Sequence, residues 1–285
     1  MSLIFGQTIF KILQSSTPQI ANIGSLKSFS IFTKKQDLKG ISPYIIVRAK
    51  QEDFREILKV MHEGYYDGEP TMAALNITPN AVLDERAIHA MTEGFTLVAK
   101  CKYNGCIVGA CINESTNPWD PDMEEKLACT VECNNVRNLI MFYAHMMRVP
   151  DLWRCLGVQK VYEMSYLFVK RPHRKKGLAY RLLEESKSLG ADAGFPVIRC
   201  DATNVHTAKI CERLGMQQVA EIPYCTYLDQ KLEPIFKPPW PNDSVKIFCD
   251  CSPQYHELKK ILQDKKSFAK FRNLKKRSQS KDEHV

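Results

Sequence analysis

The 285-residue chain is long enough to bury a full hydrophobic core, as one large domain or two small ones. Hydrophobic residues make up 44% and charged residues 25% of the sequence, which is ordinary for a soluble globular protein. No apolar run approaches the roughly 20 residues that a membrane-spanning helix needs, so we expect no integral membrane protein.

The net charge of +8 is not evenly spread. Residues 259–281 contain ten Lys or Arg side chains, which account for nearly all of the excess. The rest of the chain is close to neutral, so the overall basicity says little about a compact domain. Apolar residues at helical spacing between these charges are typical of an amphipathic helix that contacts nucleic acid or an anionic membrane, but we favour a solvated tail.

The first 36 residues contain no Asp, Glu or Arg. Mitochondrial transit peptides are usually rich in Arg, so this composition favours a flexible extension and a cytoplasmic protein over a mitochondrial one. The eleven cysteines are odd in number, and their spacing lacks the paired CxxC pattern of a zinc site. We therefore expect reduced thiols and no metal.

The first predicted element is a strand at residues 44–48, which holds three consecutive β-branched side chains. At residues 54–61 the apolar side chains recur at helical spacing, and a second helix is expected at 83–91. Two strands, at 95–101 and 106–112, flank an Asn-Gly turn, which is a strong hairpin signal.

Residues 113–132 are rich in Asn, Pro and Asp and are interpreted as an irregular insertion. A helix is expected at 135–147 and a strand at 161–169. The clearest helix is predicted at 176–193, where apolar residues share one face before a Gly and a Pro. The remaining expected elements are a strand at 197–202, a helix at 205–214, and strands at 216–222 and 245–249.

A basic, glycine-containing segment joins the strand at 161–169 to the following helix. A helix N-terminus offers unpaired N–H groups and the positive end of a dipole, so it attracts anions. Gly177 leaves room for a phosphate to approach the backbone, and three basic side chains precede it. The segment therefore predicts a pyrophosphate cradle, although such residues also occur in ordinary surface turns; it comprises Arg174, Lys175, Lys176, Gly177, Leu178 and Ala179.

The segment up to Ala179 resembles motif A of the GNAT superfamily of N-acetyltransferases, whose pattern is Arg/Gln-x-x-Gly-x-Gly/Ala. Arg174, Gly177 and Ala179 fit it. Residues 204–216 are similar to motif B of the same superfamily, which ends in a Leu-Gly-Phe type step, here Leu-Gly-Met. Together the motifs span residues 161–223 at the usual separation.

This resemblance implies an α/β fold with a central, mostly antiparallel sheet that is splayed at the cofactor site and flanked by helices. It also implies acetyl-CoA as cosubstrate, with the pantetheine arm paired to the backbone of Leu167, Phe168 and Val169. Asn204 and Thr207 are candidate cofactor contacts. His206 is another candidate, or a plain helix-start residue.

Residues 66–70 and 222–227 resemble elements of the arylalkylamine, dopamine-type N-acetyltransferases. The first contains a Glu-Pro step, and in that family its Glu is the catalytic base, which corresponds to Glu69 here. Alkylamines have a pKa near that of Lys, about 10, so a base is needed to supply the neutral amine. Asp67 is the nearest substitute base. The alternative interpretation of Glu69 is a surface carboxylate in a turn.

The general acid departs from the family pattern. The position that holds Tyr in many superfamily members is Cys211, and the dopamine-type Ser is absent from residues 201–207. A thiol with a pKa of about 8.5 could donate a proton, but Cys211 also fits a small buried helix residue. The acid is left unassigned.

The substrate prediction rests on tyrosines near Glu69. Tyr65, Tyr66 and Tyr224 are the candidate substrate contacts, with Tyr227 nearby, although tyrosines at these positions also suit a core. The expected reaction is acetylation of a small arylalkylamine or related primary amine. A polyamine, another acyl-CoA-dependent acylation, and a catalytically impaired acyl-CoA-binding module are the alternatives.

The expected organisation has three parts. Residues 1–40 form a flexible extension, residues 41–251 the N-acetyltransferase domain, and residues 252–285 the basic tail. We expect a monomer whose partners are acetyl-CoA and a small amine. Acetylation of protein lysines is a further reading, which the Glu-Pro and Tyr-rich segments disfavour.

Overall fold

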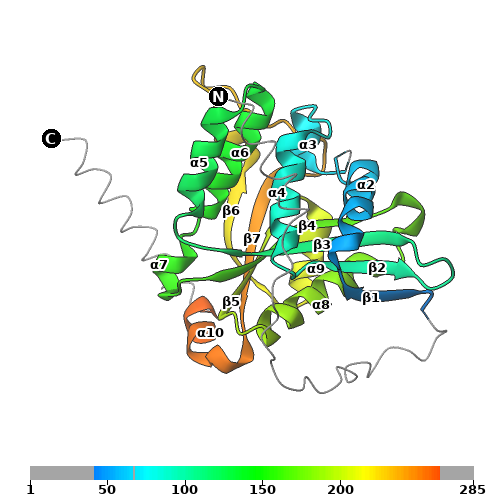
Figure 1. The fold of residues 1–285 in the computed structure, drawn as a ribbon. Helices are drawn as coiled ribbons and strands as arrows, with labels where there is room; N and C mark the ends of the chain where they lie inside the picture. The colour runs from blue at the N-terminus through cyan, green and yellow to red at the C-terminus, as the bar shows by residue number, and fades with distance from the viewer. Residues whose placement is uncertain (1–41, 67, 264–285) are drawn as a thin grey trace, which may run out of the picture. The chain divides into compact units, whose positions relative to one another are not determined.

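The computed structural model describes residues 42–66 and 68–263, and all elements below belong to the unit that begins at Pro43. A seven-stranded sheet with the order β1-β2-β3-β4-β5-β7-β6 forms its centre (Figure 1). Every pair of neighbours is antiparallel except β4 and β5. The strands are β1 (Tyr44–Arg48), β2 (Leu97–Cys101), β3 (Ile107–Thr116), β4 (Val161–Val169), β5 (Val197–Ala202), β6 (Gln217–Pro223) and β7 (Ser244–Cys251).

The parallel pair β4 and β5 is held together at one end only. Its ladder contains two pairs, Tyr162 with Ile198 and Glu163 with Arg199, and no pairing follows toward the end of β4. On its other edge β4 stays paired with β3, although Ser165 bulges out of that register. The free edge of β4 therefore faces an opening between the two strands, as the predicted splay requires.

Helices cover both faces of the sheet, and Figure 1 shows α2, α4, α5 and α6 on one side and α8 on the other. The first group shares a hydrophobic cluster with one face, whereas α8 and α9 pack on the opposite face. Short α7 and α10 close a third cluster against β4, β5 and β7. The helices are α2 (Phe54–Gly64), α3 (Pro70–Ala74), α4 (Ala81–Thr92), α5 (Asp120–Thr130), α6 (Asn134–Met147), α7 (Leu152–Leu156), α8 (Leu178–Asp192), α9 (Val205–Arg213) and α10 (His256–Gln263).

Helix α8 lies very close to β4. Leu178, Leu182 and Leu183 are buried on its inner face, at the helical spacing seen in the sequence. A Cβ on Gly190 would lie 2.7 Å from the Tyr162 ring, so only glycine permits this approach. The helix that follows the cradle is thereby held firmly against the strand that precedes it.

Most predicted elements are confirmed, and the strands at 44–48, 161–169 and 197–202 match residue for residue. The irregular insertion at 113–132 is wrong, because β3 continues to Thr116 and α5 fills Asp120–Thr130. Pro121 stands in the first turn of α5, where its missing N–H has no consequence, so it starts the helix and does not break it. The helix predicted from Lys176 begins at Leu178, since Gly177 is left-handed.

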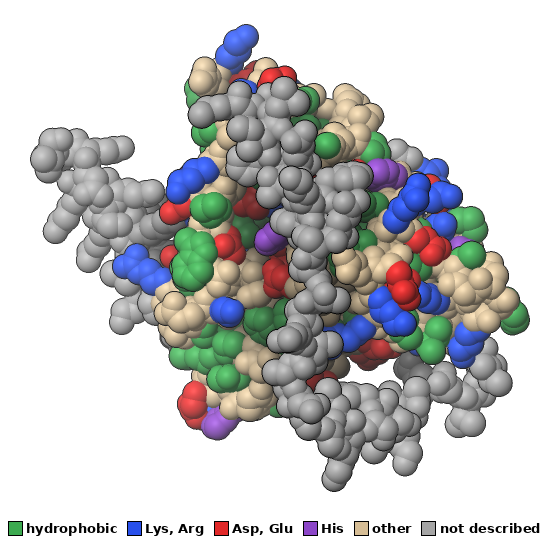
Figure 2. Space-filling view, in the orientation of Figure 1, with side chains coloured by type: hydrophobic (Ala, Val, Ile, Leu, Met, Phe, Trp, Pro, Cys, Tyr) green, Lys and Arg blue, Asp and Glu red, His purple; other side chains and the backbone are tan. Residues whose placement is uncertain are grey.

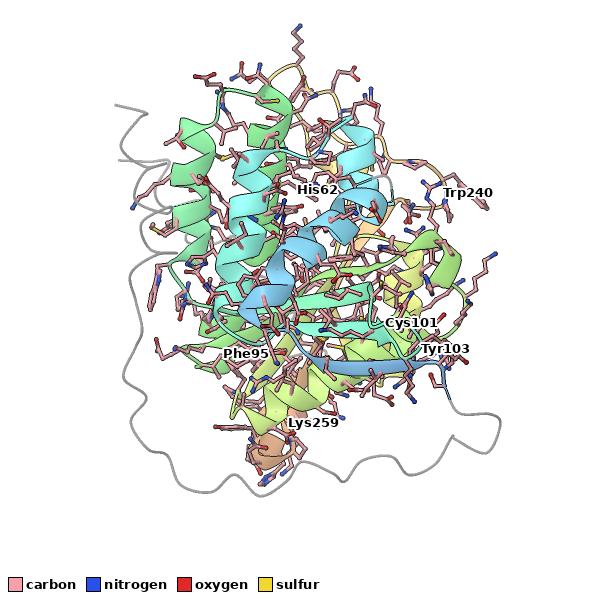
Figure 3. All side chains as sticks on the ribbon, turned by 45° about the vertical axis from the view of Figure 1, so that its right-hand side comes forward. His62, Phe95, Cys101, Tyr103, Trp240 and Lys259 are labelled. Atoms are coloured by element: carbon pink, nitrogen blue, oxygen red, sulfur yellow. The ribbon has the colours of Figure 1, made fainter. Side chains whose placement is uncertain are left out.

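The described residues also contain four short 3₁₀ turns: η1 (Gln51–Asp53), η2 (Arg171–His173), η3 (Tyr224–Thr226) and η4 (Pro253–Tyr255). The connection from η3 to β7 carries Trp240, which is 93% exposed and projects at the periphery in Figure 3. Within the described residues, no helix combines the length and apolar character that crossing a bilayer requires.

The predicted basic tail overlaps α10. Leu262 of this helix is buried against β7, and Lys259 lies 3.4 Å from the Asp250 carboxylate. The first turns of the tail thus pack on the sheet, while residues 264–285 and the N-terminal extension, residues 1–41, lie outside the described residues. Figure 2 shows basic and acidic side chains interspersed on the face it draws.

Candidate active site

A cavity opens where β4 and β5 part. Its walls come from elements far apart in the sequence: the segment after α2, helices α4 and α6, strands β3, β4 and β5, and the start of α9. Many of its side chains are polar or titratable, which is unusual for a space inside a fold. They are Tyr65, Glu69, Arg86, Glu114, Tyr143, Met146, Met147, Glu163, Met164, Ser165, Tyr166, Leu167, Cys200, Asp201, Thr203, Asn204 and Thr207.

Glu69 is the N-cap of α3, with Pro70 in the first helical position. Its Oε1 accepts hydrogen bonds from the Thr71 hydroxyl at 3.0 Å and the Thr71 N–H at 3.5 Å. Its Oε2 accepts one from the Thr203 hydroxyl at 2.9 Å, across the opening. The carboxylate is only 5% exposed, so it is a buried group on the cavity wall and not a surface carboxylate in a turn.

Burial raises the pKa of Glu69, and the hydrogen bonds from Thr203 and Thr71 partly offset this by favouring the ionised form. A carboxylate with a raised pKa is a stronger base than an exposed one. It is therefore suited to accept a proton from an ammonium or amine in the cavity. Asp67, the nearest substitute base, lies outside the described residues.

Tyr224 is buried and does not line the cavity. Its hydroxyl donates a hydrogen bond to the backbone oxygen of Thr203 at 2.8 Å. The structure thus places Tyr224 behind Thr203, which in turn contacts Glu69, so it is a positioning residue and the placement does not support a substrate contact. Tyr227 packs against the Phe142 and His145 rings, also away from the cavity.

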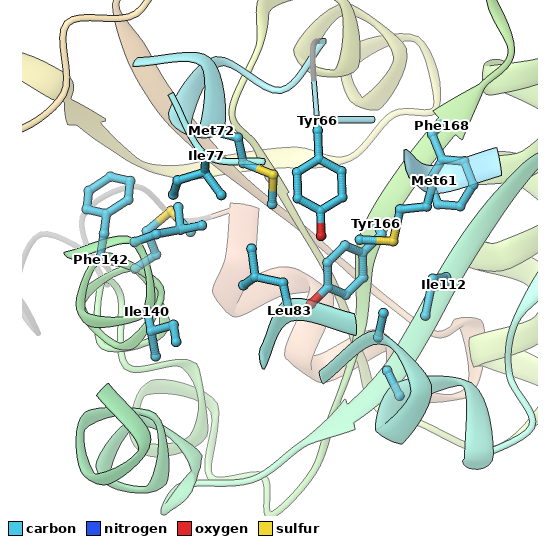
Figure 4. Close-up of a cluster of buried hydrophobic side chains, with 14 of the residues drawn as sticks. Met61, Tyr66, Met72, Ile77, Leu83, Ile112, Ile140, Phe142, Tyr166 and Phe168 are labelled. Carbon is cyan, nitrogen blue, oxygen red and sulfur yellow. The ribbon is translucent and has the colours of Figure 1, made fainter. Parts of the chain in front are cut away.

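Tyr65 and Tyr66 differ in their surroundings. Tyr65 lines the cavity and packs edge-on against Tyr166 and Phe168. Tyr66 is 3% exposed and lies in the hydrophobic cluster of Figure 4, between Met72 and Tyr166. Adjacent residues after a helix point to different sides, so Tyr66 serves the core, and its predicted contact with substrate is not supported.

The cradle segment has the backbone that its glycine implied. Gly177 adopts φ +76° and Lys175 φ +59°, and the N-terminus of α8 carries no side-chain cap among the described residues. A Cβ on Gly177 would meet nothing within 4 Å, so this glycine is required by its left-handed conformation and leaves open space before the helix. The first N–H groups of α8, including those of Leu178 and Ala179, face a site suited to an anion.

The basic side chains of the cradle make different contacts. Arg174 donates from Nε to the Val169 oxygen and from Nη2 to the Gly64 oxygen, both at 2.8 Å, so it braces the segment against the ends of β4 and α2. Lys176 donates to the Tyr44 hydroxyl at 3.2 Å. Lys175 is exposed. The positive charge predicted at the cradle is present, but Arg174 also supports the fold.

The end of β4 presents backbone, not side chains, to the opening. Phe168 and Val169 are buried in opposite clusters, while Leu167 lines the cavity. Because β4 has no pairing with β5 beyond Glu163, its backbone groups on that edge are available to an extended ligand. This is the arrangement expected for a pantetheine arm lying between the strands.

The start of α9 completes the wall. Asn204 lines the cavity, but its Oδ1 caps α9 by accepting from the N–H groups of His206 and Thr207. Thr207 also lines the cavity, whereas His206 is exposed. Cys211 is fully buried and does not line the cavity, as expected for a packing residue on the helix.

Sequence reasoning missed several wall residues. Thr203 and Thr71, which hold Glu69, are ordinary threonines with no spacing signal. Arg86 and Glu114 come from elements that no motif marks, and Tyr143 was placed only as a helix residue. One available signal was overlooked: Glu163 is the only charged residue in a strand of mostly apolar and aromatic residues. No group of three or more possible metal ligands occurs within the described residues.

A mixed sheet whose parallel strands splay beside an uncapped, glycine-led helix defines an acyl-CoA-dependent acyltransferase of the GNAT type. Residues 54–216 match the Acetyltransferase (GNAT) family, more than half of the chain, and the protein therefore belongs to that family. The match covers the cradle, the start of α9 and Glu69.

Several solved structures of similar fold come from insects. A mosquito arylalkylamine N-acetyltransferase-like 5b and arylalkylamine N-acetyltransferase 2 of Aedes aegypti each show 23% identity and a TM-score of 0.69, covering 73% of this chain and 99% or 98% of their own. A Drosophila melanogaster polyamine N-acetyltransferase shows 22% identity and a TM-score of 0.68, covering 73% of this chain and 99% of its own. At this identity the likeness establishes the fold.

Proposed function

We propose that the protein N-acetylates a small primary amine, with acetyl-CoA as donor, by direct attack on the thioester. The observation that carries this proposal is the position of Glu69. A buried carboxylate of raised pKa stands at the opening between β4 and β5, opposite the backbone edge that suits the pantetheine arm. A base beside a thioester site is what amine acetylation needs.

The steps balance as follows. The acceptor ammonium loses one proton to Glu69, directly or through a water molecule, and the neutral nitrogen attacks the thioester carbonyl carbon. The nitrogen releases its second proton as the amide forms, and this proton balances the charge of the departing thiolate. The new C–N bond forms, the C–S bond breaks, and coenzyme A leaves as a thiolate. Backbone N–H groups on the free edge of β4 are suited to polarise the carbonyl oxygen. The donor of the thiolate's proton is unassigned, because Cys211 is fully buried away from the cavity.

Two acceptor classes suit the cavity. The rings of Tyr65, Tyr143 and Tyr166 favour an arylalkylamine, the class in the names of two structural neighbours. The wall carboxylates favour a polyamine-type acceptor, the class in the name of another. We further propose a cytoplasmic monomer.

The rival proposal is an acyl-CoA-binding module without catalysis. It is weakened by Glu69, because a buried carboxylate held by two hydroxyls is expensive to keep where it has no reaction to serve. The rival predicts binding of acetyl-CoA without thiol release on any amine.

Thiol release from acetyl-CoA tests the proposal with dopamine, tyramine, serotonin, spermidine and agmatine as acceptors. Glu69→Gln is expected to lower kcat/KM about 100-fold or more, the usual contribution of a general base, with the Kd for acetyl-CoA unchanged. Glu185→Gln on α8, outside the cavity, is the matched control. An unchanged kcat/KM in Glu69→Gln across the pH range would rule out this base.

A further inference from the structure

The cavity holds more negative charge than its cations neutralise. Besides Glu69, its walls carry Glu114, Glu163 and Asp201, and the one Lys or Arg among the lining residues is Arg86. Arg86 is already engaged, because its Nε and Nη2 donate to the Glu124 carboxylate and its Nη1 to the Tyr166 hydroxyl. Its hydrogen bonds thus go to Glu124 and Tyr166, and it acts on Glu114 and Glu163 only through its charge at longer range.

Asp201 forms an ion pair with a buried side chain that does not line the cavity. Arg199, which is 1% exposed, donates from Nε and Nη2 to the two Asp201 oxygens, each at 2.8 Å. Its Nη1 and Nη2 also donate to backbone oxygens at the end of α6. The guanidinium hydrogen bonds to Asp201 and to backbone, and it acts on Glu163, its register partner across β4 and β5, through its charge alone. Two wall carboxyl groups, Glu114 and Glu163, therefore form no ion pair with a Lys or Arg among the described residues.

Glu114 and Glu163 are direct cross-strand neighbours, since β3 and β4 pair them in register. Side chains opposite each other in an antiparallel pair lie close together, and like charges there repel. Glu114 receives a hydrogen bond from the Ser165 hydroxyl. The Oε2 atom of Glu163 is buried and has no hydrogen-bond partner among the described residues.

An unpartnered buried carboxylate is costly, and a second one opposite raises the cost. Burial and the nearby Asp201 raise the pKa of Glu163 to about 8, against the opposing charges of Arg199 and Arg86, so the free site favours a protonated Glu163 and a bound cation would favour its ionised form. An ammonium or guanidinium between the two carboxylates would remove both penalties. Arg199 and Arg86 act on Glu163 through their charge only, no described side chain hydrogen bonds to its Oε2 atom, and the position opens into the cavity where the acceptor is expected.

Glu163 and Glu69 stand at different ends of this cavity. Glu163 belongs to the last residue pair that still joins β4 to β5, at the closed end of the splay. Glu69 reaches Thr203, just beyond the end of β5, where the strands have parted. A linear acceptor can therefore place its reacting nitrogen at Glu69 and its other end at Glu163.

We propose that Glu163, with Glu114 opposite, is a subsite for a second positive charge, and that it makes the enzyme select amines with a distal ammonium or guanidinium group over monoamines. This inference rests on the proposed function, since it names the acceptor of the same site. Glu163 is a specificity-determining residue in it, distinct from the base Glu69.

The test compares acceptors that differ only in the distal charge. Thiol release is measured for diamines of three to six carbons and for the monoamines of equal chain length, with wild type and Glu163→Gln. We expect wild-type kcat/KM to favour the best diamine at least tenfold over its monoamine, and Glu163→Gln to abolish that preference by raising KM more for the diamine than for the monoamine. Glu185→Gln should keep the wild-type pattern.

Two results would overturn the subsite: equal kcat/KM for diamine and monoamine in wild type, or a Glu163→Gln effect that is the same for both. Calorimetric titration of the same diamines into the protein with bound coenzyme A separates the two proposals. Glu163-dependent diamine binding without thiol release would retain the subsite and refute the acetyltransferase. Diamine binding that is absent, or equal in Glu163→Gln, would refute the subsite whatever the activity.

Discussion

Two helix starts flank the opening between β4 and β5, and they are built in opposite ways. Helix α3 begins with Glu69, whose carboxylate caps the helix and is held by Thr71 and Thr203. Helix α8 begins with a left-handed Gly177 and has no side-chain cap. The start of α3 is capped by a carboxylate, whereas the start of α8 has no side-chain cap.

Because of this difference in capping, the two helix starts suit different ligand groups. A helix start that already holds a carboxylate repels phosphate, whereas an uncapped start with basic neighbours attracts it. Under the proposed function, the pyrophosphate of acetyl-CoA binds at the start of α8, and Glu69 at the start of α3 is the base. Each start can be altered by itself, so the comparison can be tested from either side.

The largest effect on acetyl-CoA binding is expected from placing a negative charge at the N-terminus of α8. Gly177→Glu introduces a carboxylate at the anion site and forces a non-glycine residue into the left-handed region, so the Kd for acetyl-CoA should rise about 100-fold or more. Isothermal titration measures it. Gly177→Asn, which tolerates positive φ, should stay within about tenfold of wild type. Unimpaired binding in Gly177→Glu would refute the cradle.

A smaller effect is expected from loosening the α3 start. Thr203→Val removes the hydroxyl that favours ionised Glu69, so the pKa of Glu69 should rise further. The acidic limb of the kcat/KM profile then moves to higher pH, and activity at pH 7 falls roughly tenfold, as for one lost hydrogen bond to a charged group. Thr203→Ser keeps the hydroxyl and should keep the wild-type profile. An identical profile in Thr203→Val would show that this bond does not tune the base.

The smallest effect concerns stability. Because the folded-state pKa of Glu69 is raised, the native protein binds the proton more tightly than the unfolded chain does. Its contribution to the free energy of unfolding is greatest below the ordinary carboxyl pKa and declines as pH rises through the folded-state value. Thermal unfolding of Glu69→Gln should therefore show a weaker fall in Tm over that range than wild type; parallel Tm curves would contradict the raised pKa.

Different parts of the fold were predictable to different degrees. The strands at 44–48, 161–169 and 197–202 were predicted to the residue, because each contains consecutive or closely spaced β-branched or aromatic side chains. Helix α5 was missed because its proline and acidic residues resemble a loop locally, yet both suit a first helical turn. The short α3 and α7 have too few residues for a periodic signal.

The residues of the candidate site were also predictable from the sequence to different degrees. The cradle could be located from its order of residues, since a glycine at a helix start has a local backbone reason. The predicted substrate contacts of Tyr66 and Tyr224 are not supported by their positions, since both are buried and outside the cavity lining, and the direction of a tyrosine side chain depends on the local backbone. The pairing of Glu114 with Glu163 depends on strand register, which no local pattern specifies across a bulge.

By itself the sequence determined the family, the strand-to-helix cradle and the carboxylate at residue 69, because each depends on the order of neighbouring residues. Only the tertiary structure decided that Thr203 meets Glu69 across 134 positions, and that the Oε2 atom of Glu163 has no hydrogen-bond donor among the described residues. Burial, register and the parting of β4 from β5 arise from contacts between distant segments. These contacts set the charge and the pKa of the groups in the cavity.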